Sequence, residues 1–215
     1  DVAISLSHEI GRIGLLEREN AAIMNACLRE LATGIIDAFR AAVGEFGVEA
    51  PVYLSQNDGT LMNVEYAERY PVATFASGPT NSMRGAALLS GVRDCAVVDI
   101  GGTTTDVGVL MQGFPREASI AVDIGEVRTN FRMPDVLSLG LGGGSVVRAE
   151  GVLAIGPDSV GYELPARARV FGGDTLTATD LAVAGGLATD IGDRARLSSL
   201  DSDLVERGLE LITRT

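Results

Sequence analysis

The stretch "VVDIGGTTTDVGVL", residues 97–110, places two glycines and three threonines between Asp99 and Asp106, with strand-like apolar residues on both sides. Two glycines allow a sharp turn and leave no Cβ between successive backbone N–H groups and an incoming anion. Threonine hydroxyls add further donors. Asp99 stands at the carboxyl end of a predicted buried strand, where a carboxylate can hold Mg²⁺ together with substrate phosphates. The stretch therefore predicts a phosphate-binding turn.

A plain hairpin is the alternative interpretation of this turn, because Gly-Gly alone is sufficient for a tight connection. A hairpin requires neither an acid at each end nor three consecutive threonines, so the binding interpretation is favoured. The stretch is not a Walker loop, because the GxxxxGK[ST] pattern and its Lys are absent, and it is not a GxGxxG fingerprint.

A second glycine cluster, "GLGGGS" at residues 140–145, lies between a strand-like "VLSL" and a predicted short helix, "SVVRAE" at 145–150. Amides at a helix N-terminus can approach a ribose or phosphate closely when no side chain shields them. A flexible connection is the alternative. A third stretch, "SGPTNSMRG" at 77–85, could aim a helix N-terminus at the same ligand, but helix capping by Ser77 or Thr80 explains it without one.

Composition narrows the class of protein. The 215 residues carry a net charge of -12 and a pI near 4.5, and no basic patch offsets this charge, so nucleic acid and anionic membranes are excluded as partners. The longest apolar stretch, residues 85–100, is interrupted by charged residues, which argues against a membrane span and favours a cytoplasmic location. Cys27 and Cys95 lack metal-ligand spacing and are expected to be reduced and buried. His8, the one histidine, lacks the second His of HExxH and is expected to be structural.

The pattern of apolar residues predicts helices mixed with central strands, which indicates an α/β fold. A four-residue apolar step predicts a helix over 20–46 with one buried face, made of Ile23, Cys27, Leu31, Ile35, Phe39 and Val43. The stretch 71–91 is predicted to begin as a strand and to continue as a helix that ends at Gly91. Two further helices are predicted, one that begins at a threonine cap within 175–188 and one over 201–213.

Three strands are predicted to form a meander, at 94–100, 106–113 and 118–124. Single strands are predicted at 50–56, 136–139, 151–157 and 168–173.

Five stretches together resemble the hydantoinase A / oxoprolinase family, whose N-methylhydantoinase A-like members belong to the sugar kinase, heat-shock chaperone and actin ATPase superfamily. They are "SLSHEIGRIGLLEREN", "LSQNDGTLM", "SGPTNSMRGA", "VVDIGGTTTDVGVL" and "LGLGGGSV". The resemblance runs from about residue 4 to residue 190. It implies a ribonuclease H-like (actin-like ATPase) domain over 71–215, with a mixed central sheet flanked by helices. Residues 1–70 would form a helical segment with a short strand from a preceding subdomain.

The resemblance also implies roles for individual residues. Asp99 and Asp106 would be the catalytic carboxylates that hold Mg²⁺ on the phosphates of ATP. The phosphates would contact Gly101, Gly102, Thr103, Thr104 and Thr105, and the nucleoside side would contact Gly142, Gly143, Gly144 and Ser145. Family members use ATP to open small cyclic amides such as hydantoin or 5-oxoproline, or for related carboxylations, often with a hydantoinase B-type partner subunit. A non-catalytic nucleotide-sensing or partner-activating module is the alternative function.

The sequence departs from the family pattern in two places. Nothing in residues 1–60 matches the second Asp/Gly/Thr phosphate hairpin that family members carry near their own N-terminus. After Gly161, "ELPARARVFGG" lacks the cysteine that family members carry in a Gly-Pro-x-Cys-Tyr segment. The chain also begins at Asp1 without Met, so it is expected to be a piece that holds half of a nucleotide cleft and is inactive by itself.

Overall fold

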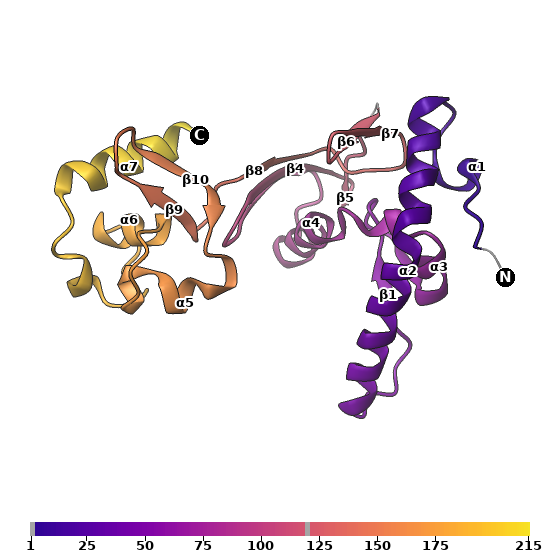
Figure 1. Cartoon of the computed structure of the whole chain (residues 1–215), viewed down its shortest axis with the longest axis horizontal. Coiled ribbons are helices and arrows are strands. Elements are labelled where there is room, and N and C mark those ends of the chain that lie inside the picture. Colours follow the sequence, from indigo (N-terminus) through magenta and orange to yellow (C-terminus); the bar gives the residue numbers. More distant parts are fainter. Residues whose placement is uncertain (1–2, 119–120) are drawn as a thin grey trace. The chain divides into compact units, whose positions relative to one another are not determined.

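The computed structural model describes residues 3–118 and 121–215, and the chain divides into two compact units (Figure 1). The first unit comprises Asp1–Val97 and Gly108–Val136, and the second comprises Val98–Val107 and Leu137–Thr215. Helix α3 (Val64–Arg69) and the 3₁₀ helix η1 (Pro71–Thr74) both contact α2 (Leu16–Glu45) within the first unit. The domain boundary predicted at residue 70 stays a prediction.

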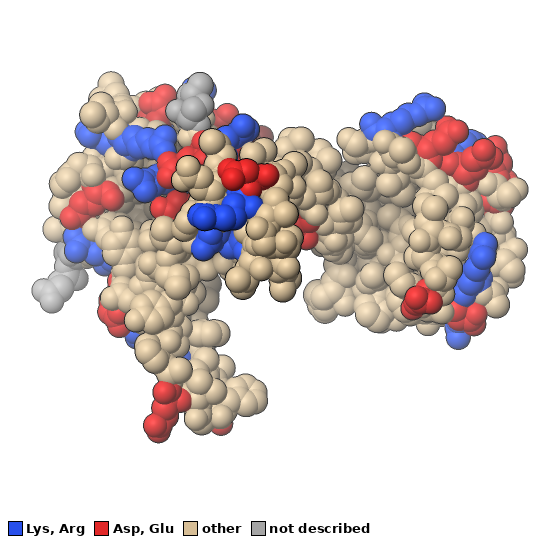
Figure 2. Space-filling view, turned by 180° about the vertical axis from the view of Figure 1, so that it is seen from behind, with Lys and Arg blue, Asp and Glu red and all other residues tan. Residues whose placement is uncertain are grey.

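Helix α2 is confirmed as a long helix, but its predicted buried face is wrong. Ile23 and Ile35 are both 60% exposed, and Cys27 is exposed as well, contrary to the expectation of a buried thiol. A strict step of four residues turns by about 400°, so such a row drifts by about 40° per step around the helix. The residues that α2 buries are Ala21, Asn25 and Ile36. On the face shown in Figure 2, the projecting end of α2 is largely uncharged, with acidic side chains at its tip.

The remaining N-terminal elements pack against α2 in two small cores. Helix α1 (Ser7–Ile10) precedes it, and a hairpin of β1 (Tyr53–Ser55) and β2 (Leu61–Asn63) pairs Leu54 with Met62. One core contains Ile36, Met62, Val64 and Ala67, and the other contains Ala21, Val72 and Phe131. The strand predicted at the start of 71–91 is wrong, because Pro71 begins η1 there.

Helix α4 (Ser77–Ser90) ends at Gly91, as predicted, in the left-handed region at φ 72°. The predicted N-caps, Ser77 and Thr80, are wrong. Ala76 is the N-cap residue of α4, and no side chain accepts a hydrogen bond from the first amides of the helix. Thr80 is instead fully buried, and its hydroxyl donates to the carbonyl oxygen of Asn57 at 3.2 Å.

A four-stranded sheet is formed by β3 (Cys95–Ile100), β4 (Thr105–Met111) and β5 (Phe114–Pro115) in that order, with β8 (Val136–Leu139) pairing with β4. The strand that follows β4 and pairs with it is β5, not the strand predicted at 118–124. Gln112 and Gly113 both have positive φ, which closes a two-residue hairpin and returns the chain immediately as β5. Part of the predicted strand 118–124 forms β6 (Val122–Ile124), which pairs with β7 (Val127–Thr129), and residues 119–120 lie outside the described residues.

Strand β3 is not buried on both faces as predicted. Its residues alternate between partly buried and exposed, and the exposed set includes Val98 and Ile100. Cys95, at the start of the strand, is partly buried. Among the described residues, no helix is both long enough and apolar enough to cross a lipid bilayer.

The second unit combines an antiparallel pair with several short helices. Strands β9 (Ser145–Arg148) and β10 (Ala154–Ser159) pair antiparallel. The predicted helix at 145–150 is wrong, because alternating burial around Val146 and Val147 suits a strand. The predicted strand at 168–173 is also wrong, because the 3₁₀ helix η3 (Arg169–Phe171) occupies it. The other elements are η2 (Gly161–Glu163), α5 (Leu164–Arg167), α6 (Ala178–Ala184), η4 (Arg194–Leu197) and α7 (Ser202–Arg214).

Helix α6 anchors the second unit. A threonine caps it, as predicted: Thr177 is the N-cap residue and forms a capping box with Asp180. Leu181 on α6 is fully buried with Val147 and Leu176, and Leu204, Val205 and Leu209 of α7 pack against this cluster. These contacts fix the positions of β9 and of the glycine loop that precedes it.

Candidate functional site

The predicted phosphate turn connects β3 to β4 within the second unit. The N–H of Gly101 donates to the carbonyl oxygen of Thr104 at 2.9 Å, which closes the turn. Gly101, Gly102 and Thr103 are exposed, and a Cβ added to Gly102 would meet no heavy atom within 4 Å. The turn therefore leaves open space directly beside its main chain.

Three successive N–H groups in this turn are available to a ligand. Among the described residues, the amides of Gly102, Thr103 and Thr104 donate no backbone hydrogen bond. Consecutive amides without a backbone acceptor can bind an anion where their N–H groups converge. Whether this turn binds a phosphate group, as the sequence predicts, stays a prediction.

The two carboxylates differ in their contacts. Asp99, at the end of β3, is partly buried and makes no side-chain hydrogen bond among the described residues. Asp106 accepts hydrogen bonds from the Ser138 hydroxyl and, at 3.4 Å, from the Thr104 hydroxyl. In the described part of the chain, no cluster of three Asp, Glu, His or Cys side chains could enclose a metal ion. One or two carboxylates are enough for Mg²⁺ where phosphate and water supply its other ligands.

The glycine loop at 140–145 packs directly against the phosphate turn. The N–H of Gly143 donates to the carbonyl oxygen of Gly101 at 3.0 Å, and that of Gly144 donates to the carbonyl oxygen of Gly102 at 2.7 Å. The Thr105 hydroxyl donates to the carbonyl oxygen of Leu141 at 2.7 Å. These bonds join the two glycine clusters into one structure.

Close approach of the two main chains explains why the loop contains glycine. A Cβ at position 142 would lie 2.7 Å from backbone atoms of Gly101, Gly102 and Thr103. A Cβ at position 144 would lie 2.8 Å from Ser159 Oγ and 2.9 Å from the carbonyl oxygen of Gly102. Real Cβ atoms essentially never approach other heavy atoms this closely, so glycine is required at both positions.

The amides of the glycine loop donate hydrogen bonds within the protein. Gly142 N–H donates to Ser145 Oγ at 2.9 Å, and Ser145 N–H donates to the carbonyl oxygen of Gly142 at 3.0 Å. Ser145 is fully buried. Because strand β9 follows the loop, there is no helix N-terminus here of the kind that the sequence predicts. The loop instead supports the turn that carries the open amides.

Sequence reasoning missed three polar side chains that hold this arrangement. Thr179 contacts the carbonyl oxygen of Gly143 through both its N–H, at 2.9 Å, and its hydroxyl, at 2.8 Å. Ser159 donates to the carbonyl oxygen of Gly102 at 3.2 Å, and Ser138 donates to Asp106. No local signal marks these residues, because each contacts a segment at least 32 positions away. His8 lies exposed on α1, in the other unit.

The chain is similar in sequence to longer proteins. The hydantoinase/oxoprolinase family model matches residues 18–214. The acetophenone carboxylase gamma subunit of Aromatoleum aromaticum is 26% identical over 187 residues, which is 83% of this chain and 25% of the relative. The acetone carboxylase beta subunit of Xanthobacter autotrophicus is 35% identical over 115 residues, which is 50% of this chain and 16% of the relative. The chain thus spans a quarter or less of the length of these relatives.

Two solved structures share the fold. The nucleotide-free structure of acetone carboxylase, an enzyme of ATP-dependent acetone carboxylation, matches with a TM-score of 0.69 and 22% identity, covering 96% of this chain and 32% of that chain. The ATP-dependent caprolactamase of Pseudomonas jessenii matches with a TM-score of 0.67 and 26% identity, covering 97% of this chain and 33% of that chain. The predicted α/β, actin-like ATPase fold class is confirmed. Since the family model covers nearly the whole chain, this protein belongs to the hydantoinase/oxoprolinase family.

Proposed function

We propose that the turn between β3 and β4 binds the phosphates of ATP with Mg²⁺. The observation that carries this proposal is the row of three open amides, Gly102, Thr103 and Thr104, in a turn braced from behind by the glycine loop. This support favours binding, because hydrogen-bond donors that are already fixed in position lose little conformational entropy when the ligand binds. The shared fold with ATP-dependent enzymes supports the choice of nucleotide over other anions.

Roles for the individual residues follow from their contacts. Gly101, Gly102, Thr103, Thr104 and Thr105 form the phosphate turn, in which Thr105 acts through its bond to Leu141. Asp99 and Asp106 would hold Mg²⁺, and Ser138 would orient Asp106. The bound ion would neutralise charge on the transferred phosphoryl group. Gly142, Gly143, Gly144 and Ser145 would lie on the nucleoside side and keep the turn in place.

The whole protein would use this nucleotide to activate a carbonyl group. We propose phosphorylation of the amide oxygen of a small cyclic amide, which makes its carbonyl carbon electrophilic enough for attack by water, or the related activation of a ketone for carboxylation. The printed names of the relatives support this range, since they include a caprolactamase and subunits of two ketone carboxylases. A hydantoinase B-type partner subunit would contribute to turnover, and the present chain alone is expected to bind nucleotide without turnover.

Nucleotide binding can be tested residue by residue on the 215-residue chain. In ¹⁵N NMR spectra, MgATP and MgADP are expected to shift the amide signals of Gly102, Thr103 and Thr104 saturably, whereas adenosine does so far less. Asp99→Asn is expected to weaken MgATP binding about 10- to 100-fold, because a charged metal ligand is lost.

The matched control is Asp123→Asn. Asp123 is an exposed carboxylate on β6, in the other unit. This variant is expected to bind MgATP like the unaltered chain. The proposal is wrong if MgATP leaves the three turn amides unchanged, or if both variants lose affinity equally.

A further inference from the structure

Two arginines of the first unit, Arg84 and Arg93, meet at the turn of the hairpin between β4 and β5. Arg84 belongs to α4, and Arg93 belongs to the segment that joins α4 to β3. A Cβ added to Gly113 in the turn would lie 3.4 Å from Arg93 Nε and 3.7 Å from Arg84 Nη1. The two guanidinium groups are therefore close to each other, and Gly113 is buried next to them.

Neither of these guanidinium groups pairs with a carboxylate among the described residues. Elsewhere in the first unit, arginines do pair with carboxylates: Arg12, Arg40, Arg69, Arg116, Arg128 and Arg132. Acidic residues are abundant in a chain of net charge -12, yet none neutralises this pair in the described part of the fold. Two like charges repel each other, and an anion bound between them would remove this repulsion.

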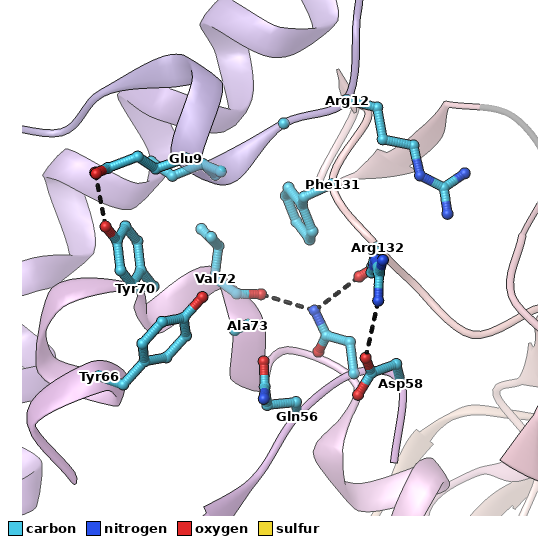
Figure 3. Close-up of a pocket in the computed structure, with 13 residues that line it drawn as sticks. Glu9, Arg12, Gln56, Asp58, Tyr66, Tyr70, Val72, Ala73, Phe131 and Arg132 are labelled. Atoms are coloured by element: carbon cyan, nitrogen blue, oxygen red, sulfur yellow. Dashed lines mark hydrogen bonds and ion pairs between the residues drawn. The ribbon is translucent and has the colours of Figure 1, made fainter. Parts of the chain in front are cut away.

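Two carboxylates near the pair bind other groups. Asp58 precedes Gly59, and a Cβ added to Gly59 would lie 3.3 Å from Arg84 Cδ. The Asp58 carboxylate nevertheless pairs with Arg132 at 3.4 Å, as Figure 3 shows. Asp94 accepts from a backbone N–H of the hairpin turn at 2.8 Å. An anion would therefore not have to displace either carboxylate from an ion pair with Arg84 or Arg93.

The hairpin turn holds both guanidinium groups in place. Arg93 Nη2 donates to the carbonyl oxygen of Gln112 at 2.8 Å, and Arg84 Nη1 donates to that of Gly113. The Arg84 guanidinium also lies over the ring of Phe114, 4.0 Å from its centroid. The N–H of Gly113 donates to the carbonyl oxygen of Arg93 at 2.7 Å. Such a site is formed before its ligand arrives, which lowers the entropic cost of binding.

Both guanidinium groups keep N–H donors for a ligand. Each carries more N–H groups than the one that bonds to the turn, and these groups match the oxygens of carboxylate and phosphate. A carboxylate presents its two oxygens in one plane, which suits a single guanidinium group. A phosphate presents oxygens on several sides, so two guanidinium groups from different segments can bind it together. Two positive charges further favour the dianion.

We propose that Arg84 and Arg93 form a binding site for a phosphate dianion, which is either inorganic phosphate or the phosphate group of a small monoester. The two side chains donate to different oxygens of the phosphate. This site belongs to the first unit, whereas the phosphate turn belongs to the second, so the inference goes beyond the proposed function and does not rest on it.

The test uses the full chain with ¹³C-labelled arginine, without nucleotide, at constant ionic strength and at about pH 8, where phosphate groups are mostly dianions. Inorganic phosphate is expected to shift the Cζ signals of Arg84 and Arg93 saturably in the millimolar range. Phenyl phosphate is expected to shift the same two signals. Tighter binding of phenyl phosphate identifies a monoester as the ligand, and equal binding identifies the free ion.

Acetate, a monoanion, is the comparison ligand. It is expected to bind at least several-fold more weakly than inorganic phosphate. Equal affinity for acetate and phosphate would overturn the proposal, because general attraction to positive charge would then explain both. Unchanged Cζ signals of Arg84 and Arg93 in the presence of both phosphates would overturn it as well.

Arg93→Gln is expected to weaken phosphate binding about 5- to 10-fold, because charge-assisted hydrogen bonds are lost. Arg93 is exposed, so thermal unfolding of this variant should resemble that of the unaltered chain. Arg84→Gln should weaken phosphate binding at least as much, because it also removes the contact with Phe114. Unchanged phosphate affinity in a folded Arg93→Gln chain refutes the assignment.

The matched control is Arg29→Gln. Arg29 lies in the same unit, has no carboxylate partner among the described residues, and donates to the carbonyl oxygen of Ile4 at 3.0 Å. The variant removes the same charge and is expected to bind phosphate like the unaltered chain. Equal weakening in Arg29→Gln and Arg93→Gln would show that net charge alone attracts phosphate, which contradicts a site at the hairpin.

The site at the hairpin and the nucleotide site give separate signals. Residues 99–106 contain no arginine, so arginine signals report on the hairpin and the turn amides report on nucleotide. Arg93→Gln is expected to keep the shifts that MgATP causes in the turn amides. Asp99→Asn is expected to keep the shifts that phosphate causes in Arg84 and Arg93. Failure of either proposal therefore leaves the other measurable.

Discussion

Asp180→Ala is expected to destabilise the second unit by about 3 kcal/mol or more. Asp180 is fully buried, and its Oδ1 accepts from the N–H of Val170 at 2.7 Å. Its Oδ2 accepts from the N–H of Thr177 at 2.7 Å and from the Thr177 hydroxyl at 2.9 Å. The variant leaves two buried N–H groups without a partner, and each such group costs about 1–3 kcal/mol.

Hydrogen exchange measured by mass spectrometry on the full chain checks this prediction. Peptides covering α5, η3 and α6 should lose protection in Asp180→Ala, whereas peptides covering α4 in the first unit should keep theirs. This readout does not require the two units to unfold together. Asp174→Ala is the control, because Asp174 is exposed and, among the described residues, its carboxylate accepts a hydrogen bond only from the neighbouring Thr175 hydroxyl. The stability of Asp174→Ala should stay within about 0.5 kcal/mol of that of the unaltered chain. Equal protection of the α5, η3 and α6 peptides in the two variants would contradict the assigned role of Asp180.

Elements with a local signal could be predicted from the sequence. The turn at 99–106, the threonine cap of α6 and the end of α4 at Gly91 all depend on residues within one turn of the feature. Elements whose structure depends on contacts between distant parts of the sequence could not be predicted. Residues 145–148 form a strand because β10 pairs with them, and the apolar row through Ile23 and Ile35 on α2 remains exposed because Val72 and Phe131 pack around Ala21 instead.

The same distinction applies to the site. The composition of "DIGGTTTD" predicts open amides, and the structure leaves those of Gly102, Thr103 and Thr104 without backbone partners. The glycine loop carries a similar composition, yet its amides bond to the turn. The difference arises from long-range contacts, including the bonds of Thr179 to Gly143, which no spacing in the sequence encodes. Two glycine clusters of like composition therefore have different structural roles.

Gly142→Ala is expected to destabilise the second unit by about 1–3 kcal/mol and to weaken MgATP binding together with it. The added Cβ would lie 2.7 Å from main-chain atoms of the phosphate turn, and main chain cannot move aside as a flexible side chain can. The loop and the turn must separate, which breaks the bonds from Gly143 to Gly101 and from Gly144 to Gly102. The open amides then lose the support that fixes their directions.

Gly102→Ala distinguishes an effect on ligand binding from an effect on the stability of the second unit. Its added Cβ meets no heavy atom within 4 Å, so stability should stay within about 0.5 kcal/mol of the unaltered chain. The same methyl group occupies the space that an anion needs beside the amides, so MgATP affinity should fall about 3- to 10-fold. Thermal unfolding and the NMR titration of the turn amides measure the two quantities on each variant. If Gly102→Ala binds MgATP normally while Gly142→Ala binds it poorly, the ligand contacts the glycine loop and the turn only supports it, which reverses the roles proposed for the two clusters.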